Sequence, residues 1–172
     1  EAYRGKAKAG VHATNYGVGD RKLAQALGIT VHEASGFRAR WFAAHPGIRK
    51  WHLRTEEAAG KRGYIENKFG ARLYTLGVVN LPELLGWLPQ STVAGVINRV
   101  LVNIDGAEQA GETSIQLLLQ CHDSLAGQFL TQRTEEEVTR LRNLAQIVVP
   151  YDDPLVIPTG IKLSSKSWGD AK

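Results

Sequence analysis

The pattern of apolar and polar positions changes near residue 63. Before it, apolar residues recur at helical spacing, and turn or capping residues separate four predicted helices: 4–17, 21–28, 30–45 and 48–62. Asp20 is expected to cap the second helix. Thr30, with Glu33 three residues later, has the spacing of a capping box for the third. The first part of the chain is therefore predicted to be α-helical.

After residue 63 the pattern alternates between strands and helices. GYIENKFGARLYTLG predicts a hairpin that turns near residues 68–70. Residues 81–110 predict a long helix in which Pro89 either makes a kink or starts the main segment. The remaining predicted elements are a hairpin of residues 113–120 and 124–130, a helix over 134–148, and a strand within 153–165. The fold class is therefore α+β, an α-helical segment followed by an antiparallel α+β lobe.

Composition places the chain among globular proteins. Of its 172 residues, 43% are hydrophobic and 22% are charged. No apolar run is long enough for a membrane span, and the N-terminus lacks a signal-peptide pattern. The single Cys121 excludes an internal disulfide and fits a reducing compartment, so we expect a cytoplasmic location.

The charge is unevenly distributed along the chain. The formal net charge is +4, and the first 75 residues are richer in Lys and Arg than the rest. A basic half indicates an anionic partner such as nucleic acid, although a solvated basic face would give the same count. The chain has no Met and begins Glu-Ala-Tyr. We therefore expect it to be a piece of a larger protein, with part of the functional machinery outside it.

One side of the first predicted helix combines polar groups suited to a nucleotide. Lys8, His12, Asn15 and Tyr16 share this side on a period of 3.6 residues. Lys8 and His12 could bind phosphate oxygens, and the Tyr16 ring could contact a base or sugar. From spacing alone, the favoured interpretation is simpler: an exposed basic helix whose Tyr16 packs in a core.

The second predicted hairpin carries a carboxylate at its tip. His122 and Asp123 separate two apolar runs, with no Gly or Pro to form the turn. Asp123 either accepts backbone hydrogen bonds or binds a hard cation such as Mg²⁺, and His122 is expected to orient the turn. Two-metal chemistry needs a second acid, which we expect to come from outside this chain. A zinc site is not indicated, because there is no second Cys.

These segments together resemble family A DNA polymerases. KAKAGVHATNYGVGDRKLAQALGI resembles the fingers helix called motif B, and LLLQCHDSLAGQF resembles the motif C hairpin. The other similar segments, in the family's order, are PGIRKWHLRTEEAAGKRGYIENKFGARLY, LPQSTVAGVINRVL and IKLSSKSWGDA. They cover nearly the whole chain. The sequence HATNYG resembles that of phage or viral members of the family more than that of bacterial members.

The resemblance implies a role for individual positions at the nucleotide. Lys8 lies where the family usually has an Arg that contacts the incoming phosphates, and His12 where it usually has a catalytic Lys. Tyr16 lies at the aromatic position near the sugar, and Asn15 precedes it in the same dNTP site. Asp123 lies at the motif C metal ligand, which implies Mg²⁺ as cofactor. Lys8, His12 and Asp123 are thus the implied catalytic residues.

The resemblance also implies contacts to DNA and a missing portion. Gln90 lies at the reader of the minor groove, Arg99 follows it on the same helix, and His122 lies beside the primer terminus. Residues 1–62 would be fingers, and residues 63–172 would include the palm. The motif A aspartate would lie upstream, in an N-terminal polymerase fragment. The implied partners are a DNA primer–template and dNTPs, with no membrane.

Several positions depart from the family pattern. Asp20 replaces a Tyr at the base of the motif B helix, and Ser124 replaces the Glu that commonly follows the motif C aspartate. Pro82 and Gly86 replace an Arg and an Asn upstream of Gln90. Three other interpretations remain: a single-subunit RNA polymerase fragment, a non-catalytic DNA-binding module of polymerase descent, and an unrelated basic helical protein.

Overall fold

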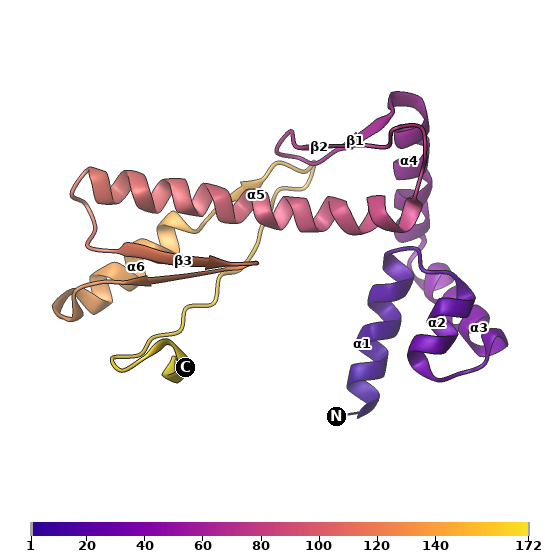
Figure 1. Ribbon diagram of the computed structural model, residues 1–172, viewed down its shortest axis with the longest axis horizontal. Helices are drawn as coiled ribbons and strands as arrows, with labels where there is room; N and C mark the ends of the chain where they lie inside the picture. Colours follow the sequence, from indigo (N-terminus) through magenta and orange to yellow (C-terminus); the bar gives the residue numbers. More distant parts are fainter. Residues whose placement is uncertain (1, 172) are drawn as a thin grey trace. The chain divides into compact units, whose positions relative to one another are not determined.

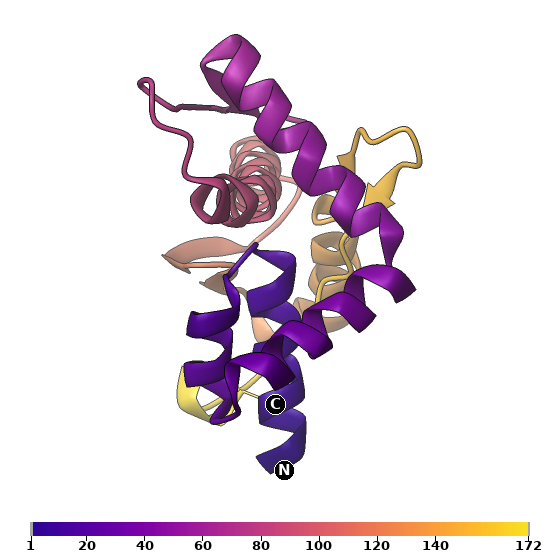
Figure 2. The same ribbon diagram turned by 90° about the vertical axis from the view of Figure 1, so that its right-hand side faces the viewer.

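The computed structural model describes residues 2–171, with side chains from residue 4 onward. The chain divides into two compact units, Glu1–Gln90 and Ser91–Lys172. Over the described residues, helices alternate with three separate two-stranded antiparallel sheets (Figures 1 and 2). The α+β prediction is therefore confirmed.

The first unit begins with four helices whose ends follow local sequence signals. They are α1 (Ala2–Asn15), α2 (Asp20–Leu27), α3 (Val31–Ala44) and α4 (Pro46–Arg62) (Figure 1). Gly28 and Gly63 end α2 and α4 in the left-handed region, at φ 67° and 73°, where glycine has no steric penalty. The predicted capping box of Thr30 and Glu33 is present.

The prediction that Asp20 caps α2 is wrong. Gly19 is the N-cap and makes no side-chain cap bond, and Asp20 is the first helical residue. The Asp20 carboxylate instead pairs with the guanidinium of Arg38 on α3. The Asp20 carboxylate therefore bonds to a charged partner on a neighbouring helix, which gives a stronger hydrogen bond than a local backbone N–H.

Close packing of α1 on α2 and α3 depends on a glycine. Leu23, Leu27 and Ala34 are buried between these helices, with Phe37 packed against them. A Cβ at Gly10 would lie 3.3 Å from Leu27 and 3.4 Å from Phe37, so even an alanine would require these two side chains to shift by a few tenths of an ångström.

The predicted hairpin after α4 is confirmed. Strands β1 (Tyr64–Glu66) and β2 (Arg72–Tyr74) pair antiparallel, and Ile65 is buried with Ala59 of α4 and Leu84 of the following helix. The hairpin therefore belongs to the first compact unit. The compact units divide after Gln90, and the boundary between fingers and palm at residues 62 and 63 stays a prediction.

Helix α5 (Leu81–Gln109) runs from the first unit into the second as one continuous element. Pro89 lies inside it, so it does not start a separate helix. Among the described residues, no helix combines the length and apolar character needed to cross a bilayer.

The second unit contains the remaining elements. They are β3 (Gln116–Cys121), β4 (Ser124–Gln128), η1 (Thr131–Arg133), α6 (Thr134–Leu144), β5 (Val148–Val149), β6 (Leu155–Val156) and η2 (Trp168–Asp170). One prediction is corrected here: α6 ends at Leu144 and does not reach residue 148, because Val148–Val149 pairs with β6. The predicted strand within 153–165 is confirmed, as the short strand Leu155–Val156.

A buried carboxylate joins α6 to the chain just before β3. Glu137 has no exposed surface, and it accepts hydrogen bonds from the Ser114 N–H and hydroxyl, both at 2.9 Å, and from the Thr113 hydroxyl. Burial alone would raise the pKa of Glu137, but these hydrogen bonds outweigh it, and the pKa lies below its usual range. The acid is a structural anchor for the base of the β3–β4 hairpin.

Candidate functional site

Helix α1 presents a row of basic side chains to solvent. Arg4, Lys8 and His12 follow one another at intervals of four residues, and all three are exposed. The His12 ring lies 6.0 Å from the ring of Tyr16, which is half-buried just after the helix ends. No carboxylate occurs within α1. The row therefore has no acid within its own helix, and it leads to an aromatic ring.

Arg4 was not among the residues predicted from the sequence. The signal was present, because Arg4 precedes Lys8 by the same four residues that separate Lys8 from His12. Lys6 is also exposed, but it is about 200° around the helix from Arg4 and so lies off the row.

The predicted nucleotide contact Asn15 is bonded to the rest of the first unit. Its side-chain oxygen accepts a hydrogen bond from the Trp41 indole N–H at 2.8 Å. Its carbonyl lies 2.7 Å from Nε2 of the buried His52. A nucleotide contact by Asn15 stays a prediction, and its amide nitrogen takes no part in these two bonds.

The Asp20–Arg38 pair fixes α2 to α3 beside this helix. The hydrogen bond from Arg38 lowers the pKa of Asp20, so the carboxylate is ionised near neutral pH. The Asp20 position therefore serves an ion pair between two helices of the first unit.

The hairpin tip that carries Asp123 is a two-residue loop. Cys121 pairs with Ser124 across the turn, and His122 adopts φ 52° between them. Positive φ is uncommon outside glycine, but His is among the residues that tolerate it. The Ser124 hydroxyl closes the turn by donating to the Cys121 carbonyl at 2.8 Å. His122 therefore orients the turn, and Asp123 is left exposed at its tip.

A bulge below the tip shapes the same hairpin. Leu117 pairs with Gly127 and Leu119 with Ala126, so Leu118 is the extra residue of a bulge. A Cβ at Gly127 would lie 2.8 Å from the Gln116 carbonyl oxygen, closer than real Cβ contacts. Only glycine fits this register without a shift of the backbone.

Asp123 could supply one oxygen ligand to a hard cation such as Mg²⁺. Among residues 2–171 there is no group of three His, Cys, Asp or Glu side chains that could hold a metal ion. Asp123 could therefore supply one ligand of a metal site, and the described residues do not form a complete set of ligands.

The predicted primer–template residues have different surroundings. Gln90 and Arg99 are both exposed on α5, and the Arg99 guanidinium donates to the Gly95 carbonyl at 3.1 Å. His122 is exposed at the hairpin tip. Gln90 lies in the first unit, whereas Arg99 and His122 lie in the second.

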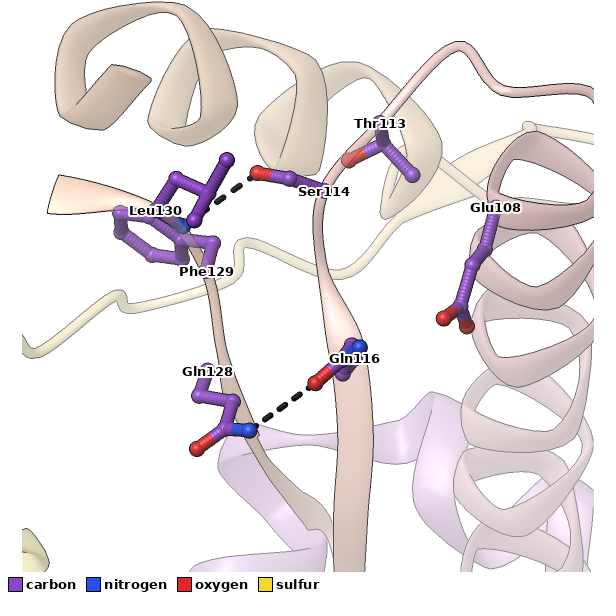
Figure 3. A pocket seen from close by; sticks show the side chains of 7 residues that line it. All are labelled: Glu108, Thr113, Ser114, Gln116, Gln128, Phe129 and Leu130. Atoms are coloured by element: carbon purple, nitrogen blue, oxygen red, sulfur yellow. Dashed lines mark hydrogen bonds between the residues drawn. The ribbon is translucent and has the colours of Figure 1, made fainter. Parts of the chain in front are cut away.

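A pocket of about 440 Å³ opens at the base of the same hairpin (Figure 3). Its lining residues are Glu108, Thr113, Ser114, Gln116, Gln128, Phe129 and Leu130. Gln128 donates to Gln116 at 2.9 Å, and the Leu130 N–H donates to Ser114 at 3.3 Å (Figure 3). Because these polar groups bond to one another, the pocket offers few unused partners for a ligand.

Charge separates between the two compact units. Residues 1–90 contain 14 Lys and Arg against 7 Asp and Glu, a net of +7, and residues 91–172 contain 7 against 10, a net of −3. The excess of cations on the unit that contains α1 favours polyanions there.

Comparison with known proteins gives consistent relatives. DNA polymerase family A matches residues 1–170. The thermostable DNA polymerase I of Thermus filiformis is 31% identical over 166 residues, which cover 91% of this chain and 19% of that protein. DNA polymerase I of Geobacillus stearothermophilus is 28% identical over 179 residues, covering 98% of this chain and 20% of that protein. The chain thus spans about a fifth of the length of these relatives.

The fold also matches a solved structure. The POL domain of Pol1 from M. smegmatis, in complex with DNA primer-template and dNTP, superposes with a TM-score of 0.76 at 24% identity. The match covers 83% of this chain and 27% of that one. At this identity the similarity describes the fold.

Proposed function

Because the chain belongs to DNA polymerase family A, we propose that it is the C-terminal portion of a DNA-directed DNA polymerase. Residues 1–62 would act as fingers and residues 63–172 would include the palm. The reaction would be template-dependent transfer of a nucleotide to a primer end. The sequence HATNYG favours a phage or viral source for this chain, whereas the relatives named above are bacterial.

The observation that carries this proposal is the row of basic side chains on α1. Arg4, Lys8 and His12 present positive or protonatable groups at successive turns, which suits the length of a triphosphate. His12 would donate a proton or hydrogen bond to the leaving pyrophosphate. Tyr16, at the end of the row, would place its ring against the sugar or base.

Asp123 would contribute one carboxylate to the reacting centre. Bound Mg²⁺ would supply charge neutralisation at the transferring phosphate and activate the primer 3′-hydroxyl. The second carboxylate would come from a motif A segment on another portion of the polymerase. The exposed tip supports this role, because Asp123 is accessible in a two-residue turn that the Ser124 hydroxyl closes.

Contacts with primer–template would come from Gln90, Arg99 and His122. All three side chains are exposed and polar, so each can reach DNA without unfolding its element. Positive charge over residues 1–90 would add attraction to phosphates that is independent of base sequence and sensitive to salt. The family match favours DNA over the RNA polymerase alternative.

Nucleotide binding by the 172-residue chain tests the proposal directly. A titration with dATP and Mg²⁺, followed by amide chemical shifts, should perturb α1 around Lys8 and His12. Lys8→Ala and His12→Ala should weaken binding, and Lys6→Ala is the matched control, since it removes an exposed lysine from the other side of α1. If Lys6→Ala weakens dATP binding as much as Lys8→Ala does, α1 attracts the nucleotide only through its overall charge, and the proposed site on α1 is contradicted.

Primer extension tests the missing carboxylate. The purified chain should extend no primer by itself, because the second acid of the proposed site would come from a motif A segment outside it. Steady extension by this chain alone would contradict the requirement for a motif A segment.

A further inference from the structure

Two aromatic side chains from different helices converge on the last residue of α1. The Trp41 indole N–H of α3 donates to the side-chain oxygen of Asn15 at 2.8 Å. The His52 Nε2 of α4 lies 2.7 Å from the carbonyl of the same residue. One residue of α1 is thereby tied to two neighbouring helices.

These bonds complete the end of the helix. The last carbonyls of an α-helix have no partner within it. Here the carbonyls of residues 12–14 accept from the backbone N–H groups of residues 16–18, with Gly17 in the left-handed region at φ 73°. The carbonyl of Asn15 remains, and His52 takes it.

The chemistry of this contact fixes the state of His52. A carbonyl can only accept, so Nε2 must carry the proton and donate it. Burial lowers the pKa of His52, and the cations Arg49 and Arg38 lower it further, while the bond to Asn15 opposes them. His52 is therefore a neutral donor at neutral pH, packed edge-on against Phe42 at 5.5 Å.

We propose that Trp41 and His52 are positioning residues for nucleotide binding by α1. The inference rests on the proposed function of α1. Neither side chain needs to touch the nucleotide. By holding Asn15 they fix the last turn of α1, which contains His12, and the direction in which the next residue, Tyr16, leaves the helix.

A double-mutant cycle on the 172-residue chain isolates this effect. Trp41→Phe keeps an aromatic ring but removes the indole donor, and Asn15→Ala removes its acceptor. Trp41→Phe should raise the Kd for dATP and Mg²⁺ about fivefold, the value of one net hydrogen bond. Asn15→Ala should raise it at least as much, because it removes this bond together with the predicted nucleotide contact of the amide nitrogen. The double variant should be no weaker than Asn15→Ala alone, since the bond to Trp41 is already lost there.

A matched control and a nucleotide-free measurement accompany the cycle. Trp51→Phe makes the same change at an aromatic of α4 that, among the described hydrogen bonds, makes none to α1, so its Kd should stay at the wild-type value. Without nucleotide, amide exchange at residues 16–18 should accelerate about fivefold in Trp41→Phe and in Asn15→Ala. Nitrogen-15 spectra should show the proton of His52 on Nε2 and a bare Nδ1.

The outcomes separate this inference from the proposed function. If dATP binds through Lys8 but Trp41→Phe and Asn15→Ala bind it as tightly as wild type, the positioning role is overturned and the nucleotide site stands. A second outcome is that dATP does not bind, but amide exchange at residues 16–18 still accelerates in Trp41→Phe and Asn15→Ala and no further in the double variant. The proposed function then fails, and the anchoring of α1 stands. A proton on Nδ1 with a bare Nε2 would overturn the part assigned to His52.

Discussion

Replacing Glu137 with alanine should loosen the base of the β3–β4 hairpin by about 3 kcal/mol. The buried carboxylate accepts from the Thr113 hydroxyl and from both the N–H and the hydroxyl of Ser114. Alanine removes the acceptor for all three donors at once.

The magnitude follows from what each donor can do afterwards. The Ser114 N–H is fixed by the backbone, so its loss costs about 1–3 kcal/mol. The two hydroxyls can rotate toward other acceptors, so each loses about 1 kcal/mol. Relief from burying a carboxylate offsets part of this sum, which leaves a net loss of about 3 kcal/mol.

Amide hydrogen exchange measures this change locally. At about 1.4 kcal/mol for each factor of ten, the amides of β3 should exchange roughly a hundredfold faster in Glu137→Ala. Glu135→Ala removes an exposed acid from the same first turn of α6, so it should leave them within about threefold. Amides of α2, in the other compact unit, serve as an internal reference. Unchanged β3 protection in Glu137→Ala would refute the anchoring role.

Three further changes test other parts of the fold. Gly127→Ala should destabilise the hairpin by about 1–3 kcal/mol, measured by urea unfolding, because its Cβ would meet the Gln116 carbonyl; a neutral result would contradict the observed register. Thr30→Ala should cost about 1 kcal/mol of thermal stability by removing the N-cap of α3. The pKa of His52 is lowered, so its contribution to the free energy of unfolding is complete above about pH 6.5 and is lost as pH falls through the lowered pKa. His52→Gln should remove this part of the pH dependence of the free energy of unfolding, measured by urea unfolding at several pH values. The same pH dependence in His52→Gln and wild type would contradict the role of His52.

Local signals predicted much of the secondary structure. The capping box at Thr30, the glycines after α2 and α4, and the alternating pattern around β1 and β2 each act within a few residues. Their energetics do not depend on distant partners, so sequence alone reveals them. The α+β class follows from the same signals.

Long-range pairings could not be predicted in this way. Asp20 has the sequence of a cap, yet Arg38, 18 residues away, takes its carboxylate. Glu137 has the sequence of a helix-dipole acid, yet it is buried and accepts from a segment 23 and 24 residues earlier. Which polar groups meet in space is decided by tertiary packing, and a single sequence carries no direct record of it.

The placement of Asp123 depends on a hairpin that is constrained along its whole length. Glu137 holds the base, the bulge at Leu118 opposite Gly127 sets the register, and His122 with the Ser124 hydroxyl closes the tip. None of these constraints uses the carboxylate of Asp123 itself. A carboxylate that were needed to form its own turn would lose hydrogen bonds whenever it bound a cation. Because the turn is closed by its neighbours, Asp123 can exchange water for a ligand without destabilising the loop that presents it.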